Sequence, residues 1–111
     1  MIVDLSYLKT FTKGNEVKFK RYINLYLEDA PDTFERMRGN IDEENWADLA
    51  IYAHSLKPKA DFMGIASLKE ILVRIEDGVK QEEYGDLKSL YEKALEIHEE
   101  AVIVLRKEVA G

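Results

Sequence analysis

Apolar residues recur at spacings of three and four along four long segments of the chain, and polar residues fill the positions between them. This spacing places the apolar side chains on one side of an α-helix, so it predicts four amphipathic helices. A shorter segment near the N-terminus shows the same spacing. No segment has the clean alternation of apolar and polar residues that is typical of a half-buried β-strand. The pattern therefore predicts an all-α fold.

Capping residues and helix breakers predict where these helices begin and end. Capping side chains are expected at Asp4, Asn15, Asp42 and Asp86. Helix ends are expected at 12–14, at 39–40, before Gly64 and near Gly78. Pro31 falls within the second helix, where it predicts either a kink or the start of a new helix, because proline has no N–H to donate.

Short connections between four long helices favour neighbours that run antiparallel. With 111 residues the chain is long enough for one hydrophobic core and too short for a second domain. The expected architecture is therefore a single domain over residues 1–111. It is an antiparallel four-helix bundle with a short extra N-terminal helix that packs across one end. The start at Met1 and the absence of a linker favour a free-standing protein.

Composition and charge exclude several classes of protein. A net charge of −6 disfavours a nucleic-acid binder, which usually carries a positive surface. The absence of cysteine excludes disulfides, thiolate nucleophiles and zinc sites built on sulfur. There is no apolar leader and no run of 18 apolar residues, so we expect neither a signal peptide nor a membrane span. The expected location is the cytoplasm.

The two histidines are candidates for chemistry, because a helical bundle can hold a metal centre built on Glu-x-x-His. The residues three before His54 and His98 are Ile51 and Leu95, so neither histidine has this motif. A catalytic metal centre is therefore not expected. Spacing alone does not exclude Ser-His-Asp catalysis, but there is no nucleophile elbow and no glycine-rich phosphate loop. His98 lies on the apolar stripe of the last helix and is expected to be a locally hydrogen-bonded histidine at the edge of the core.

His54 is expected to be exposed. At about 100° per residue it lies roughly 150° from the centre of the core side of its helix. Its own side of the helix carries Ala47, Ala50, Ile51, Lys57, Pro58 and Asp61. Small and apolar side chains beside an exposed imidazole would let another protein approach closely, and an ordinary surface histidine is the alternative.

Pro58 follows His54 by one helical turn and leaves the carbonyl group of His54 without its usual N–H donor. The apolar spacing continues through Pro58 without a break. The sequence thus predicts one continuous helix that bends at the histidine. The alternative is that Pro58 begins a new helix.

The run from Ala53 to Leu68, AHSLKPKADFMGIASL, resembles the signature of the histidine-containing phosphotransfer (HPt) domain family. The family pattern is A-H-x-L-K-G-x-x-x-x-x-G, followed by a leucine four residues later. The positions that match it are Ala53, His54, Leu56, Lys57, Gly64 and Leu68. The resemblance implies a helical bundle that carries a phosphoryl group on His54. Such domains relay this group between aspartates of response-regulator receiver domains, without an ATP site or kinase activity of their own.

The resemblance also implies roles for the neighbours of His54. Lys57 is the family's basic neighbour and would screen the phosphoryl oxygens, whereas Gly64 and Leu68 would be structural. Pro58 departs from the pattern, which has glycine there to give the approaching receiver room, so it bears on partner fit. Asp61 lies on the same side of the helix and could either hydrogen-bond or repel the phosphoryl group.

The expected partners are response-regulator receiver domains and a hybrid histidine kinase. Receivers present an apolar patch beside an acidic pocket. We therefore expect them to dock on Ala47, Ala50, Ile51, Pro58 and Asp61 around the histidine. The receiver would supply Mg²⁺, so the bundle needs no cofactor of its own, and we expect it to be a monomer. The alternative function is that of a scaffold or inhibitor, which binds a receiver or a histidine kinase without passing phosphate.

Overall fold

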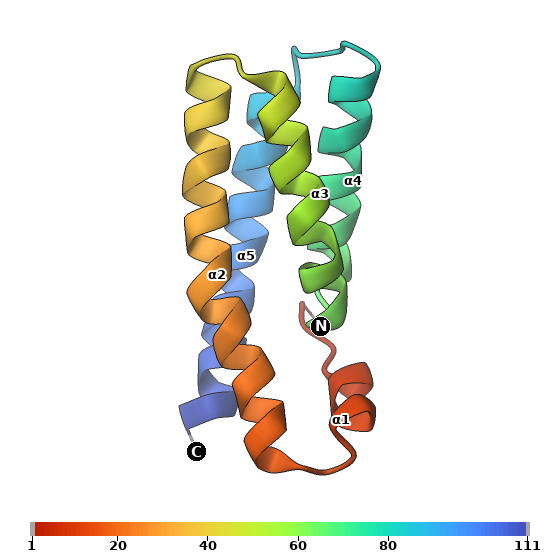
Figure 1. Cartoon of the computed structure of the whole chain (residues 1–111), viewed down its shortest axis with the longest axis vertical. Coiled ribbons are helices and arrows are strands. Elements are labelled where there is room, and N and C mark those ends of the chain that lie inside the picture. The colour runs from red at the N-terminus through yellow and green to blue at the C-terminus, as the bar shows by residue number, and fades with distance from the viewer. Residues whose placement is uncertain (1, 111) are drawn as a thin grey trace.

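The computed structural model describes residues 2–110, which form five helices and no strand (Figure 1). The helices are α1 (Ser6–Thr12), α2 (Glu16–Asp42), α3 (Trp46–Phe62), α4 (Ala66–Lys80) and α5 (Leu87–Ala110). The all-α prediction is confirmed. Residues 1 and 111, the two ends of the predicted domain, lie outside the described residues.

Helices α2 to α5 run alternately up and down the long axis of the molecule (Figure 1). Each packs against two others, α3 against α2 and α4, and α5 against the same two. The four helices therefore occupy the corners of a square, with α3 and α5 on one diagonal. Helix α1 lies beside the N-terminal part of α2, at the end of the bundle where α3 stops. This is the predicted antiparallel bundle with a short extra N-terminal helix.

The apolar stripes predicted from the spacing form one core between the helices. Side chains that are completely buried in it include Ile23, Met37, Leu49, Leu56, Leu68, Leu72, Ile75, Leu87 and Leu105. Small residues, Ala53 and Ala60, are buried on α3 and let that helix lie close to its neighbours. No helix in the described part of the chain is both long and apolar enough to span a bilayer.

Helix α2 ends later than the break predicted at 39–40. It continues through Asp42 because Ile41 is buried and extends the apolar row of the helix four residues beyond Met37. The prediction that Asp42 caps the next helix is therefore wrong. Asn45 caps α3 instead, and its side-chain oxygen accepts a hydrogen bond from the N–H of Asp48 at 3.2 Å.

The remaining helix ends lie at or near the predicted positions. Asn15 caps α2 as predicted, and α5 begins directly after Asp86. Asp4 lies one residue before the cap position of α1, which Leu5 occupies, although its carboxylate still accepts the N–H of Ser6 at 3.0 Å.

Helix α4 passes through Gly78 and ends at Lys80, two residues later than predicted. Val79 packs against the core, and this contact favours the extension of the helix beyond Gly78. The glycine serves close packing, since a Cβ at Gly78 would lie 2.8 Å from a methyl carbon of Leu87.

Both prolines lie inside continuous helices, Pro31 in α2 and Pro58 in α3. The alternatives in which either residue starts a new helix are therefore excluded. Figure 1 shows the N-terminal part of α2 inclined to the rest of that helix, and a missing N–H within the helix accounts for such a bend. The single helix predicted around Pro58 is confirmed.

Gly64 joins the N-terminal segment to the turn between α3 and α4. Its φ of +69° is the left-handed conformation expected directly after a helix. Its carbonyl oxygen accepts a hydrogen bond from the N–H of Asp4 at 2.9 Å, and a Cβ at this position would overlap the carbonyl group of Asp4. Glycine is thus required here both by the backbone conformation and by the close approach of the N-terminal segment.

The core also holds His98, which is only 5% exposed. Its Nδ1 is hydrogen-bonded to the hydroxyl group of Tyr26 at 2.8 Å, and its ring packs against Phe34 with 4.6 Å between centroids. Burial lowers the pKa of His98 to about 4 and raises the pKa of Tyr26. His98 is therefore neutral at pH 7 and inaccessible to a partner. The predicted hydrogen-bonded histidine on the apolar stripe is confirmed, but it lies within the core and its partner is on α2.

The substitution Gly64→Ala should destabilise the fold by about 1–3 kcal/mol from backbone strain alone, and it should detach the N-terminal segment. Urea unfolding measures the first effect and hydrogen exchange of the Asp4 amide the second. Gly39→Ala is the matched control, because the space around that position in α2 is open. It should stabilise the protein by up to about 1 kcal/mol. Unchanged protection of the Asp4 amide in Gly64→Ala would contradict this account.

His98 should make the protein less stable as the pH falls from 6.5 to 4. In this range the unfolded chain binds a proton at the usual pKa of 6.5, whereas the folded protein does so only near pH 4. The loss approaches about 3 kcal/mol at pH 4. Urea unfolding of the wild type and of His98→Gln, which keeps a hydrogen-bonding partner for Tyr26, measures it. The prediction fails if the stability difference between the two proteins does not change with pH.

Candidate functional site

His54 lies in the middle of α3, on the face turned away from the core. Its side chain is 72% exposed, whereas Ala53 and Leu56 beside it are completely buried. The exposure predicted from the helical wheel is therefore confirmed. The imidazole projects from the bundle, but it is held on one side, because one ring nitrogen has a partner on the neighbouring helix.

That partner is Glu76 of α4. Its Oε2 lies 2.9 Å from Nδ1 of His54, and its Oε1 lies 2.9 Å from Nζ of Lys57. The glutamate side chain is 22% exposed, so it sits at the seam between α3 and α4. One carboxylate therefore bridges the imidazole and the lysine one turn further along α3.

The charge of Glu76 is maintained by these two contacts. Partial burial raises the pKa of its carboxyl group, but the contacts with Lys57 and His54 outweigh burial, and the net pKa lies below the usual 4.5. Glu76 is thus ionised at neutral pH and can only accept hydrogen bonds. The contact therefore requires a proton on Nδ1 of His54, and in the uncharged tautomer with that proton the lone pair lies on Nε2.

Lys57 is less exposed than its place beside His54 on the outer side of α3 suggests. Its side chain is 28% exposed and its ammonium group is directed at Glu76. Sequence reasoning selected Lys57 because of its place in the motif, and the structure adds what the lysine contacts. Lys57 thus neutralises the half-buried carboxylate of Glu76, whose charge would destabilise the fold if it had no partner.

The predicted docking residues are placed around His54 on the outer face of α3. Ala47, Ile51, Pro58 and Asp61 are exposed, and Ala50 is half-buried. Asp61 is engaged by Lys69 of α4, with 3.2 Å between the charged atoms. Its charge is thus partly balanced before any partner arrives.

Gly64 and Leu68 lie where a structural role requires them. Gly64 forms the turn after α3, and Leu68 is completely buried on α4. Within residues 2–110 no group of three or more His, Asp or Glu side chains is placed to hold a metal ion.

Sequence reasoning missed Glu76. The only signal is its spacing from Leu68 and Leu72, because it is the next residue in this row of every fourth position on α4. A carboxylate that continues a buried row suggests a partner at the helix seam. The row does not show which residue of another helix that partner is.

A family model described as "Hpt domain" matches residues 21–109 of the chain. The matched region contains all of α3 and α4 and most of α2 and α5, and α1 precedes it. No curated protein and no solved structure matches the chain.

The contact with Glu76 should fix the tautomer of His54. In the wild type, ¹⁵N NMR above pH 8 should show the proton on Nδ1 and an unprotonated Nε2. Glu76→Ala removes the acceptor and should give a mixture of both tautomers, whereas the amide oxygen of Glu76→Gln should retain most of the preference. Identical nitrogen shifts for His54 in the wild type and in Glu76→Ala would show that the carboxylate does not orient the ring.

Proposed function

Because the chain belongs to the Hpt domain family, whose members transfer phosphoryl groups on histidine in two-component systems, we propose that His54 is its phosphoacceptor. The specific role is to relay the group between aspartates of response-regulator receiver domains. One observation carries the proposal. An exposed imidazole is held by an ionised carboxylate at Nδ1 and leaves Nε2 free for an incoming group.

The reaction needs an in-line nucleophile and little else from the bundle. The lone pair of Nε2 attacks the phosphorus atom of an aspartyl phosphate. The bond between phosphorus and the carboxyl oxygen breaks, and the aspartate leaves as a carboxylate with the electron pair. In the second half of the relay the P–N bond breaks instead, its electron pair returns to Nε2, and the phosphoryl group moves to the next aspartate.

Glu76 acts on this step as a positioning residue. When Nε2 bonds to phosphorus, positive charge develops on the ring, and the Nδ1–H group shares it with the carboxylate at 2.9 Å. The same contact holds the ring in one orientation before the reaction. Lys57 contributes by keeping Glu76 ionised and in place, and it lies one turn from His54, within reach of phosphoryl oxygens.

The phosphoryl group brings its own energy as an acyl phosphate, so the proposal includes no ATP site and no kinase activity. Mg²⁺ belongs to the receiver and neutralises the phosphoryl oxygens there. The partners are receiver domains and a hybrid histidine kinase, which meet a monomeric bundle in the cytoplasm. Pro58, in place of glycine, adds an exposed ring one turn from His54 and so restricts which receivers fit.

The proposal predicts that a receiver domain charged with radiolabelled acetyl phosphate transfers label to the wild type and none to His54→Gln. The label should be acid-labile and base-stable, as expected of a phosphorus–nitrogen bond. His98→Gln is the matched control, since the other histidine is buried, and it should accept label as the wild type does. Glu76→Ala should accept it roughly 10–100-fold more slowly, by analogy with other groups that orient a reactive histidine.

Two outcomes would contradict the proposal. Label that persists in His54→Gln would place the phosphoacceptor elsewhere. A receiver that binds the wild type tightly without transferring label would favour the alternative function of a scaffold or inhibitor.

A further inference from the structure

Charged side chains are segregated along the long axis of the bundle. Helices α2 and α5 are antiparallel, and the hydrogen bond between Tyr26 and His98 places these two residues at the same level (Figure 1). The residues of α2 before Tyr26 and the residues of α5 after His98 therefore lie at the same end of the bundle, together with α1. We call this end, residues 2–25 and 101–110, the basic end.

The basic end is positive, whereas the rest of the molecule is strongly negative. Residues 2–25 and 101–110 contain seven basic and three acidic side chains, a net charge of +4. Residues 26–100 contain nine basic and nineteen acidic side chains, a net charge of −10. On the outer face of α5 the sign changes within two turns, from Glu99 and Glu100 to Arg106 and Lys107.

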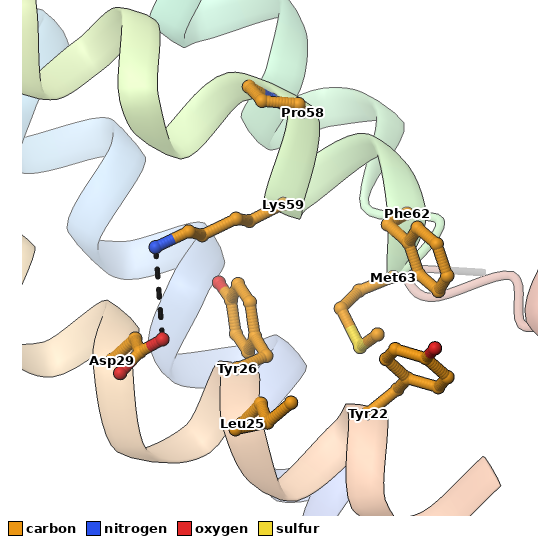
Figure 2. A pocket seen from close by; sticks show the side chains of 8 residues that line it. All are labelled: Tyr22, Leu25, Tyr26, Asp29, Pro58, Lys59, Phe62 and Met63. Carbon is orange, nitrogen blue, oxygen red and sulfur yellow. Dashed lines mark ion pairs between the residues drawn. The ribbon is translucent and has the colours of Figure 1, made fainter. Parts of the chain in front are cut away.

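Large apolar side chains are exposed at the same end. Seven such side chains are exposed in the described part of the chain, and five of them belong to the basic end: Tyr7, Phe11, Val17, Leu25 and Ile103. Leu25 lines a pocket of about 330 Å³ between α2 and α3, and one turn later Asp29 pairs with Lys59 at 3.8 Å (Figure 2). The exposed apolar side chains of α2 thus end where its acidic side chains begin.

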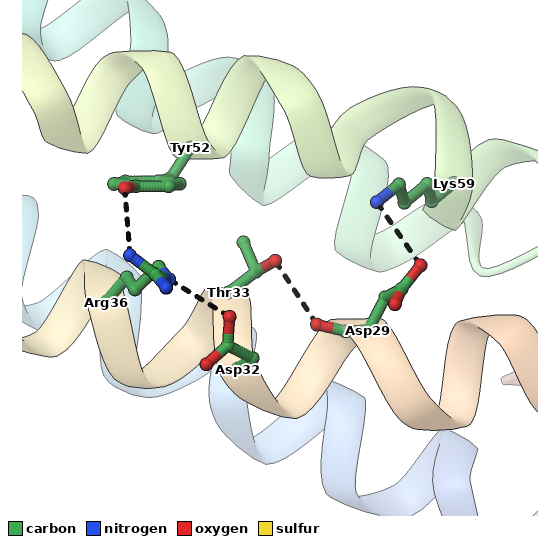
Figure 3. Close-up of polar contacts among 6 residues, drawn as sticks. All are labelled: Asp29, Asp32, Thr33, Arg36, Tyr52 and Lys59. Carbon is green, nitrogen blue, oxygen red and sulfur yellow. Dashed lines mark hydrogen bonds and ion pairs between the residues drawn. The ribbon is translucent and has the colours of Figure 1, made fainter.

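The basic side chains of this end also differ from the others in their contacts. Five basic side chains outside it pair with carboxylates: Arg36, Lys57, Lys59, Lys69 and Arg74. Figure 3 shows one of these pairs, Arg36 with Asp32 at 3.0 Å, beyond the pair of Lys59. Five exposed basic side chains of the basic end form no ion pair within residues 2–110: Lys13, Lys18, Arg21, Arg106 and Lys107. Their charge is not balanced within the molecule.

Apolar and basic side chains alternate on the outer faces of α2 and α5. Val17, Arg21 and Leu25 follow one another at every fourth position of α2. Val17 is 70% exposed and Leu25 45% exposed. On α5, Ile103 is 60% exposed and precedes Arg106 by three residues on the same face. Such a combination is typical of protein surfaces that lie in the head-group region of a bilayer with anionic lipids.

The arrangement around the end fits a lipid surface. Val17 is on α2, whereas Ile103 is on α5, the helix diagonal to α3, and Phe11 of α1 packs against Phe62 of α3. The exposed apolar side chains therefore lie on several sides of the end, with basic side chains between them. A bilayer can surround the whole end, and anionic head groups complement its charge. Repulsion of the acidic remainder would direct the long axis away from the bilayer.

We propose that the basic end binds the surface of anionic phospholipid bilayers. The unpaired lysine and arginine side chains contact phosphate groups, and Val17 and Ile103 enter the boundary between head groups and acyl chains. The proposed binding is peripheral, since no helix in the described part of the chain is long and apolar enough to span a bilayer. The inference does not depend on the proposed function.

His54 remains accessible in this orientation. Tyr22, which packs against Phe62, lies about 9 Å along the axis from the start of α2. His54 precedes Phe62 by eight residues, so it lies about 12 Å further from the basic end. Surface-bound segments enter a bilayer by about 5–10 Å. The histidine would therefore stay in water and could meet a partner while the protein is bound to lipid.

Cosedimentation of the full chain with vesicles tests the proposal. The wild type should bind vesicles of equal parts phosphatidylglycerol and phosphatidylcholine about tenfold or more tightly than phosphatidylcholine vesicles, and salt should weaken this binding. The double substitution Lys18→Glu with Arg21→Glu should weaken it about tenfold or more. The matched control is Lys88→Glu with Lys93→Glu, which changes the net charge equally at exposed residues of α5 outside the basic end. Its affinity should stay within about twofold of the wild type.

Fluorescence quenching by brominated lipid tests the orientation. The single tryptophan, Trp46, begins α3 at the opposite end of the bundle (Figure 1). Bound wild type should therefore not be quenched. The variant that combines Trp46→Phe with Val17→Trp should be quenched, because position 17 enters the bilayer. Val17→Ser should bind anionic vesicles more weakly than the wild type although its charge is unchanged.

Three results would overturn the proposal. They are no binding of the wild type to anionic vesicles at low salt, an equal loss of binding in both charge-reversal variants, and quenching of Trp46. A wild-type oligomer that Lys18→Glu with Arg21→Glu disperses, without vesicle binding, would assign the basic end to the acidic part of a second copy. Transfer of label to His54 is measured without vesicles, so this proposal and the proposed function can fail separately.

Discussion

The rest of the site depends on the contacts that the half-buried carboxylate of Glu76 makes with His54 and Lys57. The carboxylate lies at the seam of α3 and α4, where an unpaired charge would be costly, and Lys57 and His54 are the two groups that satisfy it. The imidazole is consequently oriented by a neighbouring helix although most of its own surface is in water. A side chain this exposed could not be held by packing. The bundle thus combines access for a large partner with the fixed geometry that an in-line reaction needs.

The spacing of apolar residues along the sequence was sufficient to predict the fold and to predict which histidine is buried and which is exposed. His98 falls on the apolar stripe of α5, whereas His54 lies opposite the apolar stripe of α3. The burial of each histidine therefore follows from its position on its own helix. Helix ends were less predictable, because Asp42 and Asn45 are both good caps and the choice between them depends on whether Ile41 is buried. Glu76 could not be paired with His54 from the sequence. Their contact depends on how α4 is rotated against α3, which packing of both helices determines.

The surroundings of His54 are asymmetric in a way that the sequence shows only in part. Small and apolar residues around the histidine were expected to form one docking strip. The structure divides this strip into a polar side towards α4, where Asp61 pairs with Lys69, and an apolar side towards α2, which contains Pro58. Phosphoryl oxygens and a partner's apolar side chains are thus expected on opposite sides of the ring. Pro58, in place of glycine, then adds apolar surface on the side towards α2, where the apolar side chains of a partner are expected.

Gly64 connects α3 to the N-terminal arm, which consists of residues 2–5 and α1. Its left-handed backbone ends α3, and its carbonyl group binds the N–H of Asp4, so the arm is attached to the same helix that carries the histidine. The attachment joins backbone atoms at a position where a Cβ has no room, and the packing of Phe11 against Tyr22 and Phe62 adds to it, so both hold the arm against the bundle. The aromatic rings of α1 then stand at a fixed distance from His54. A surface that is fixed in this way can select a partner by shape, since it does not have to become ordered when the partner binds.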